Sequence, residues 1–120
     1  MTKIETQTVC VTGAAGFLGS KLCRELAYRG SNVIAIDNFA VGERGCLSEI
    51  ENKIEIIKAD IRDKDSMKEY INKSDTIFHL AAIDDRKACQ KDYELAFNVN
   101  VKGTANILSL CSSMQRFIYM

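Results

Sequence analysis

The stretch Thr12-Gly13-Ala14-Ala15-Gly16-Phe17-Leu18-Gly19 places three glycines at three-residue intervals between an apolar run and an amphipathic one. The preceding run, Thr8-Val9-Cys10-Val11-Thr12, is rich in β-branched residues and predicts a strand. After the glycines, Leu18, Leu22 and Leu26 recur every four residues and predict a helix with one apolar face. The stretch therefore lies at a strand–turn–helix junction.

At such a junction each glycine has a physical role. Gly13 permits the tight turn out of the strand. Gly16 lacks a Cβ and lets a pyrophosphate approach the backbone, while Gly19 lets the helix pack closely on the sheet. The first helical residues, Phe17 and Leu18, then offer free N–H groups at the positive end of the helix dipole. Glycines also mark ordinary turns, but this context is the one that dinucleotide binding requires.

A carboxylate follows the second predicted strand. Val33-Ile34-Ala35-Ile36 is a continuous apolar run, as in a strand buried on both faces, and Asp37 comes directly after it. A carboxylate at this place can accept hydrogen bonds from the ribose hydroxyls of NAD and would repel the 2′-phosphate of NADP. An aspartate here can also be a turn former, and Arg44 nearby could weaken the preference. We expect an NAD site.

The rest of the chain continues the alternation of strand and helix. Further strands are predicted at 54–57, 76–80 and 116–120, a loop with a short helix at 38–52, and helices around 67–71 and 88–112. The connections are long enough for crossovers, so the pattern predicts an α/β fold with a parallel sheet and helices on both faces. The long helix carries an apolar stripe, which consists of Phe97, Val101, Leu108 and Cys111 and is widened by Ala96, Ile107 and Leu110.

The composition limits the classes of partner. The 120 residues form one domain at most, 1–120, and 16 basic residues balance 16 acidic ones. This balance argues against nucleic acid or an anionic membrane as a partner. Five cysteines without a Cys-x-x-Cys pair, together with the single histidine His79, argue against a metal site. A polar start and the lack of a long apolar run predict a cytoplasmic protein.

Five separately spaced segments resemble the extended short-chain dehydrogenase/reductase family, which includes NDP-sugar epimerases and dehydratases. They are the glycine stretch 12–19, Asp37-Asn38 with Gly42, Ala59-Asp60-Ile61-Arg62-Asp63, His79-Leu80-Ala81-Ala82 and Asn100-Val101-Lys102-Gly103-Thr104. The resemblance implies a doubly wound Rossmann sheet with strand order 3-2-1-4-5, here truncated at the fifth strand. It also implies NAD as the cofactor.

The resemblance assigns roles to single residues. Asp60 would accept from the adenine amino group and Ile61 would pack on the ring, while Ala81 and Ala82 would let the cofactor pass over the strand end. Asn100 would help to hold the central helix. The alternatives are a solvated turn for Asp60, ordinary core packing for Ala81 and Ala82, and an exposed helix position for Asn100. The predicted NAD-binding residues are Gly13, Gly16, Phe17, Leu18, Gly19, Asp37, Asn38, Gly42, Asp60, Ile61, Leu80, Ala81, Ala82 and Asn100.

The family's catalytic Tyr-x-x-x-Lys pair has no counterpart in these 120 residues. Four residues after Tyr28, Tyr70 and Tyr93 stand Asn, Ser and Phe rather than Lys. We therefore expect no catalytic residue here, and a chain inactive by itself that belongs to a longer, homodimeric enzyme acting on a nucleotide sugar. Two alternatives stay open: a stand-alone NAD-binding or sensor module, and an extended-family reductase acting on a non-sugar substrate.

Overall fold

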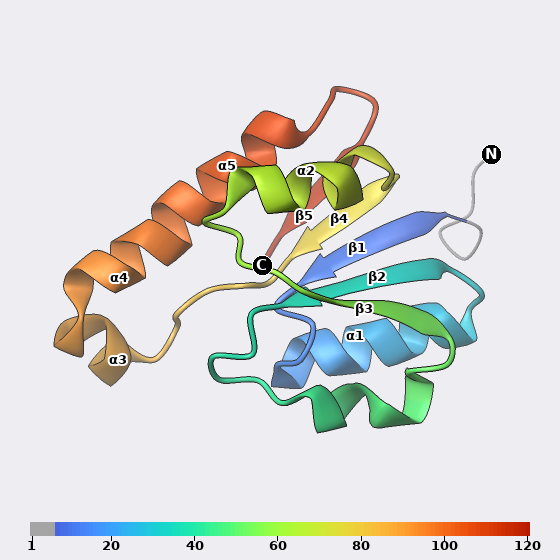
Figure 1. Cartoon of the computed structure of the whole chain (residues 1–120), viewed down its shortest axis with the longest axis horizontal. Coiled ribbons are helices and arrows are strands. Elements are labelled where there is room, and N and C mark those ends of the chain that lie inside the picture. Colours follow the sequence, from blue (N-terminus) through green and yellow to red (C-terminus); the bar gives the residue numbers. More distant parts are fainter. Residues whose placement is uncertain (1–6) are drawn as a thin grey trace.

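The computed structural model describes residues 7–120 and contains a five-stranded sheet with helices on both faces (Figure 1). The strands are β1 (Thr8–Thr12), β2 (Asn32–Asp37), β3 (Ile54–Lys58), β4 (Thr76–His79) and β5 (Arg116–Tyr119). Neighbouring strands are parallel throughout, in the order β3-β2-β1-β4-β5. The predicted fold class and strand order are confirmed.

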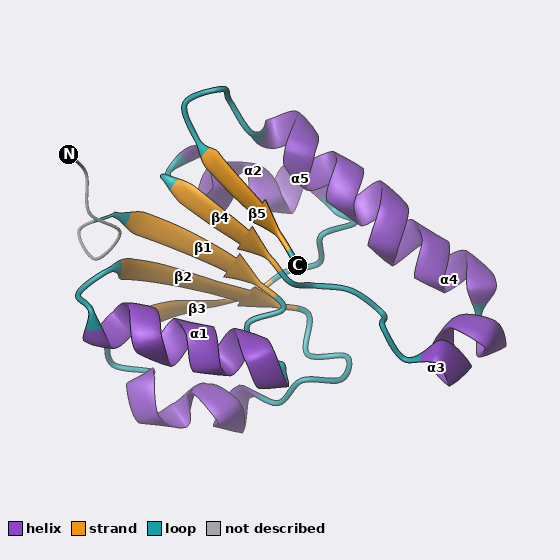
Figure 2. Ribbon diagram, turned by 180° about the vertical axis from the view of Figure 1, so that it is seen from behind, coloured by secondary structure: helices purple, strands orange, loops and turns teal. Residues whose placement is uncertain are grey.

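Two layers of helices enclose the sheet (Figure 2). They are α1 (Phe17–Tyr28), the 3₁₀ helix η2 (Arg44–Ile50), α2 (Lys64–Asn72), α3 (Arg86–Lys91), α4 (Tyr93–Phe97), the π-helical segment η3 (Asn98–Gly103) and α5 (Thr104–Leu110). α1 and η2 cover one face, and α2 and α5 cover the other. Within residues 7–120 no helix is both long and apolar enough to cross a bilayer.

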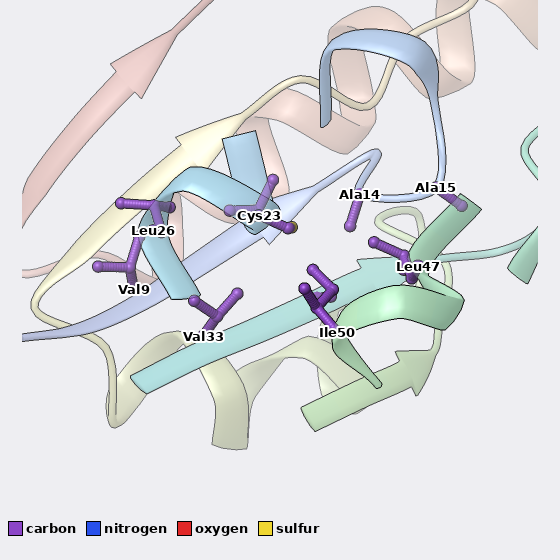
Figure 3. Packing of buried hydrophobic residues seen from close by; sticks show 10 residues of the cluster. Val9, Ala14, Ala15, Cys23, Leu26, Val33, Leu47 and Ile50 are labelled. Atoms are coloured by element: carbon purple, nitrogen blue, oxygen red, sulfur yellow. The ribbon is translucent and has the colours of Figure 1, made fainter. Parts of the chain in front are cut away.

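The two faces of the sheet have separate apolar cores. On the first face, buried residues of β1 and β2 pack against α1 and η2, as Figure 3 shows for Val9, Val33, Cys23, Leu26, Leu47 and Ile50. On the second face, Ile77 packs with Met67 and Ile71 of α2 and with Ile107 of α5. The central strands therefore carry apolar side chains on both faces, which explains the continuous apolar runs in the sequence.

The prediction of a single helix over 88–112 is wrong in one respect, because two helices separated at Asp92 form this segment. α3 ends at Lys91, and Asp92 has φ −140° and ψ 84°, which is not helical. The Asp92 carboxylate accepts a hydrogen bond from Leu95 N at 3.0 Å and so caps the start of a new helix. This second helix runs from α4 through η3 into α5 and ends at Leu110.

The helix α4–η3–α5 buries one side, and its α5 part contributes Ile107 to the core on the second face of the sheet. Ala96, Gly103 and Ile107 are buried, whereas Phe97 and Val101 are 46% and 51% exposed. Leu108 is exposed to a similar extent, 49%. The apolar stripe of Phe97, Val101 and Leu108 therefore faces away from the core of this domain.

Candidate cofactor site

The site lies where the chain changes from one face of the sheet to the other. β1 is followed by α1 on the first face, and β4 is followed by the segment that leads to α5 on the second face (Figure 1). The two connections diverge between neighbouring strands, and parallel sheets bind ligands in the crevice that this divergence leaves at the carboxyl ends. A groove of about 1010 Å³ opens there, next to a smaller hollow of about 40 Å³.

The glycine-rich loop forms one wall of the groove. Gly13 has φ +70°, and a Cβ on it would lie 2.8 Å from Ala81 N at the end of β4. A Cβ on Gly19 would overlap the Gly13 carbonyl oxygen, so the helix could not pack so closely on the turn. Gly16 is the N-cap of α1, and the first turn of that helix has no acidic residue. The positive end of the helix dipole at Phe17 is therefore open to an anionic group in the groove.

Asp37 joins this loop to the segment after β2. Its Oδ2 accepts from Ala15 N at 2.9 Å, and its Oδ1 accepts from Phe39 N at 2.8 Å. Each carboxylate oxygen has capacity for a further donor, such as a ribose hydroxyl. A Cβ on Gly42 would lie 2.8 Å from Ala15 C and O, so the segment 38–43 lies directly on the glycine-rich loop.

The smaller hollow adjoins this corner. Asp37, Asn38, Asp60 and Ile61 line it together, and Val99 of η3 closes it. Asp60 accepts hydrogen bonds from the Arg62 side chain at 2.7 and 3.0 Å and from Asn38 Nδ2 at 3.3 Å. The hydrogen bonds from the Arg62 side chain lower the pKa of Asp60 to about 2. Asp60 is therefore an ionised acceptor at neutral pH.

A buried chain of hydrogen bonds lies beneath the groove and defines the state of His79. Thr12 Oγ1 accepts from Leu80 N and Ala81 N, both at 3.1 Å, so its proton is donated to His79 Nδ1 at 2.7 Å. His79 Nε2–H must then donate to Thr104 Oγ1 at 2.8 Å. Burial lowers the pKa of His79 to about 4, in agreement with a neutral ring. His79 connects β1 and β4 to the helix.

Asn100 lies outside both hollows. Its Nδ2 donates to Ile83 O at 2.8 Å, and its Oδ1 accepts from Ile83 N at 2.7 Å. This pair of bonds attaches the loop after β4 to η3. Asn100 therefore shapes the far side of the groove through the backbone.

The structure brings the other predicted residues to one place. The groove is lined by Gly13, Gly16, Phe17, Leu18, Gly19, Asp37, Gly42, Leu80, Ala81 and Ala82, and the adjoining hollow adds Asn38, Asp60 and Ile61. The sequence patterns gave no role to Thr12, to Val99, or to the groove residues Lys21 and Arg24. The position of Thr12 directly before Gly13 was the available signal for its role. In the described range 7–120, no three His, Cys, Asp or Glu side chains gather as metal ligands.

Comparisons with known proteins agree with this geometry. The chain matches the model of the NAD-dependent epimerase/dehydratase family over residues 9–120. It is 46% identical over 99 residues to a UDP-N-acetyl-alpha-D-glucosaminuronate decarboxylase of Bacillus cytotoxicus, an alignment that covers 82% of this chain and 30% of the relative.

Solved structures give the same result. An epimerase of Methanothermobacter thermautotrophicus superimposes with a TM-score of 0.87 at 34% identity, over 94% of this chain and 34% of that one. The UDP-glucose 4-epimerase of Thermus thermophilus, crystallised with NAD, gives a TM-score of 0.78 at 33% identity, over 87% and 33%. The chain thus spans about a third of the length of these relatives. It belongs to the NAD-dependent epimerase/dehydratase family, and its fold corresponds to about a third of such proteins.

Proposed function

We propose that this chain forms the NAD site of an oxidoreductase-type enzyme that acts on a nucleotide sugar. The observation that carries the proposal is the position of Asp37, whose carboxylate lies between the glycine-rich loop and the hollow lined by Asp60. Along the groove, a surface for the pyrophosphate at the glycine-rich loop is thus followed by a ribose acceptor at Asp37 and by a hollow for the base at Asp60. The relatives that act on UDP-sugars support the substrate class.

The residues present fit NAD. The α1 N-terminus behind Gly16 would hold the pyrophosphate, Asp37 the adenosine ribose, and Asp60 and Ile61 the adenine. Leu80, Ala81 and Ala82 form the floor, where the small side chains of Ala81 and Ala82 leave room beyond the end of β4. When bound, NAD supplies a reversible hydride acceptor.

Proton transfer is the part of the reaction that this chain does not supply in our proposal. Tyr28, Tyr70 and Tyr93 are not followed four residues later by lysine. The side chains that line the groove, such as Lys21 and Asp84, are not arranged as such a pair. We propose that the acid–base residues belong to a part of the enzyme outside these 120 residues, and that this chain binds and orients the cofactor.

Titration of NAD and NADP tests the cofactor assignment. We expect NAD to bind at least about tenfold more tightly, because Asp37 would face the 2′-phosphate of NADP with a like charge. Equal or tighter binding of NADP contradicts the role proposed for Asp37. Turnover of UDP-sugars by the full-length protein tests the substrate class. Binding of NAD without any turnover would favour a sensor module, and turnover of non-sugar alcohols only would favour a reductase.

The exposed stripe of Phe97, Val101 and Leu108 supports a further part of the proposal. Contiguous apolar surface on a helix is typical of a protein–protein contact. We propose that the full-length protein is a homodimer and that this helix face lies in the contact.

A further inference from the structure

The loop after β3 is held by a helix far away in the sequence. Asn106 of α5 donates through Nδ2 to Ile61 O and to Arg62 O, both at 3.1 Å. The sequence separations are 45 and 44 residues. One side-chain amide therefore pairs with two successive carbonyl groups and determines where this loop lies against α5.

A second contact acts on the same loop from the same helix. Ile61 is only 5% exposed, and its side chain lies against Gly103. A Cβ on Gly103 would lie 2.6 Å from Ile61 Cδ1 and 2.7 Å from Cγ1. The missing side chain of Gly103 thus lets Ile61 approach the helix, and Asn106 holds the backbone that carries Ile61.

The loop held in this way carries the groups that would contact the base. Asp60 and Ile61 line the hollow beside Asp37. The Asp60 carboxylate is kept ionised by Arg62, and an ionised carboxylate only accepts hydrogen bonds. Arg62 N, Nε and Nη2 and Asn38 Nδ2 already donate to this carboxylate, so the amino group of adenine would replace the Asn38 amide, whose bond of 3.3 Å is the longest of the four. The carbonyl oxygen at the same ring position of hypoxanthine would be repelled.

We propose that Asn106 is a positioning residue for base recognition. Together with Gly103 it holds the loop 60–62 so that Asp60 selects an adenine dinucleotide over the hypoxanthine analogue. This inference rests on the proposed NAD site and assigns its base specificity to α5, an element that does not line the hollow.

The test compares two ligands that differ only in the base. The dissociation constants of NAD and nicotinamide hypoxanthine dinucleotide are measured by titration calorimetry for the wild-type full-length protein and for Asn106→Ala. We expect the wild type to prefer NAD by about tenfold or more, the value of one hydrogen bond to a charged acceptor. Asn106→Ala should reduce this preference to about threefold or less. The change should come from weaker binding of NAD, while the affinity for the analogue stays nearly unchanged.

Two further variants make the result specific. Asn106→Asp has nearly the same shape but places a carboxylate against the two carbonyl groups, so it should also lose the preference. Gln115→Ala is the matched control, because Gln115 Nε2 likewise donates to two carbonyl oxygens, Ile71 O at 2.6 Å and Ser74 O at 2.7 Å. Those bonds lie before the amino end of β4, so Gln115→Ala should lower the melting temperature and leave the preference intact.

The outcomes separate this inference from the proposed function. A wild-type protein that binds neither dinucleotide contradicts the NAD site itself. If the wild type binds both equally, or if both Asn106 variants keep the wild-type preference, the NAD site stands and the role of Asn106 is refuted. An equal loss of preference in Gln115→Ala would also refute it, because the effect would then follow from general destabilisation.

Discussion

The carboxylate of Asp37, at the end of β2, accepts a hydrogen bond from the backbone N–H of Ala15 at 2.9 Å. The glycine-rich loop is thus attached to the neighbouring strand by the same side chain that is expected to bind the adenosine ribose. A second bond, from Phe39 N at 2.8 Å, attaches the segment after β2 to the same carboxylate. One residue therefore holds two walls of the groove together.

Replacement of Asp37 tests this double role. Asp37→Ala removes the ribose acceptors and leaves the N–H groups of Ala15 and Phe39 without this partner. We expect NAD affinity to fall by about tenfold or more and the discrimination against NADP to disappear. Titration calorimetry with both dinucleotides measures the effect.

The matched control for this variant is Asp75→Ala. The Asp75 carboxylate likewise accepts from a backbone N–H, that of Thr8 at 2.9 Å, and lies before the amino end of β4, away from the groove. Its loss should cost about 1 kcal/mol of stability and leave NAD affinity unchanged. Wild-type affinity in Asp37→Ala, or equal losses in the two variants, would contradict the role of Asp37.

Gly42 is expected to be intolerant of any side chain. A Cβ there would meet the backbone of Ala15 at 2.8 Å, and backbone cannot move aside as a flexible side chain can. Gly42→Ala should therefore displace the segment 38–43 from the glycine-rich loop and weaken NAD binding severalfold. Gly45→Ala is a control three residues away, because a Cβ at Gly45 has no neighbour within 4 Å. The prediction fails if the two alanine variants bind NAD equally well.

The pH dependence of stability should reveal the buried His79. Burial lowers its pKa from 6.5 to about 4, so the folded state prefers the neutral ring while the unfolded chain takes up a proton below pH 6.5. The stabilisation is fully present above pH 6.5 and is lost as the pH falls towards 4. We expect the free energy of unfolding to decrease by about 2 kcal/mol between about pH 7 and pH 5.

Urea unfolding at several pH values measures this dependence. His79 is the only histidine, which makes the window above about pH 5 specific for it. His79→Gln should remove most of the slope in that window. The pKa of the Asp60 carboxyl is lowered from its usual value of 3.8 to about 2, so its contribution to stability is lost only below about pH 3.8. This range lies outside the pH window of His79. A slope that persists unchanged in His79→Gln would refute the assignment.

The exposed helix stripe gives a prediction about assembly. Val101→Glu places a charge between Phe97 and Leu108 on the outer face of α4–η3–α5, where Val101 is 51% exposed. We expect this variant to shift the full-length protein from dimer to monomer in sedimentation experiments, because a buried unpaired charge opposes association. Met114→Glu is the control, since Met114 is 90% exposed outside this helix. A dimer unaffected by Val101→Glu would rule out this contact.

Several features of the site could be predicted because their signals are local. The turn at Gly13 requires a positive φ, and Asp37 follows an apolar run whose end is evident in the sequence. The bond between Asn106 and Ile61 leaves no local signal, because it joins residues 45 positions apart. The break at Asp92 has a local cause, the cap on Leu95 N, but the apolar pattern was equally compatible with an unbroken helix.

The sequence by itself determined the alternation of strands and helices, the glycine-rich turn and the carboxylate after the second strand, because each depends on a few neighbouring residues. Only the tertiary structure decided which face of the long helix is buried. Ala96, Gly103 and Ile107 are buried, whereas Phe97 and Val101 remain exposed. Gly103 lets the helix approach Ile61, and Ile107 joins the core on the second face of the sheet. The tertiary structure also decided the protonation of His79, since its two partners, Thr12 and Thr104, are brought together only by the parallel pairing of β1 with β4 beneath α5.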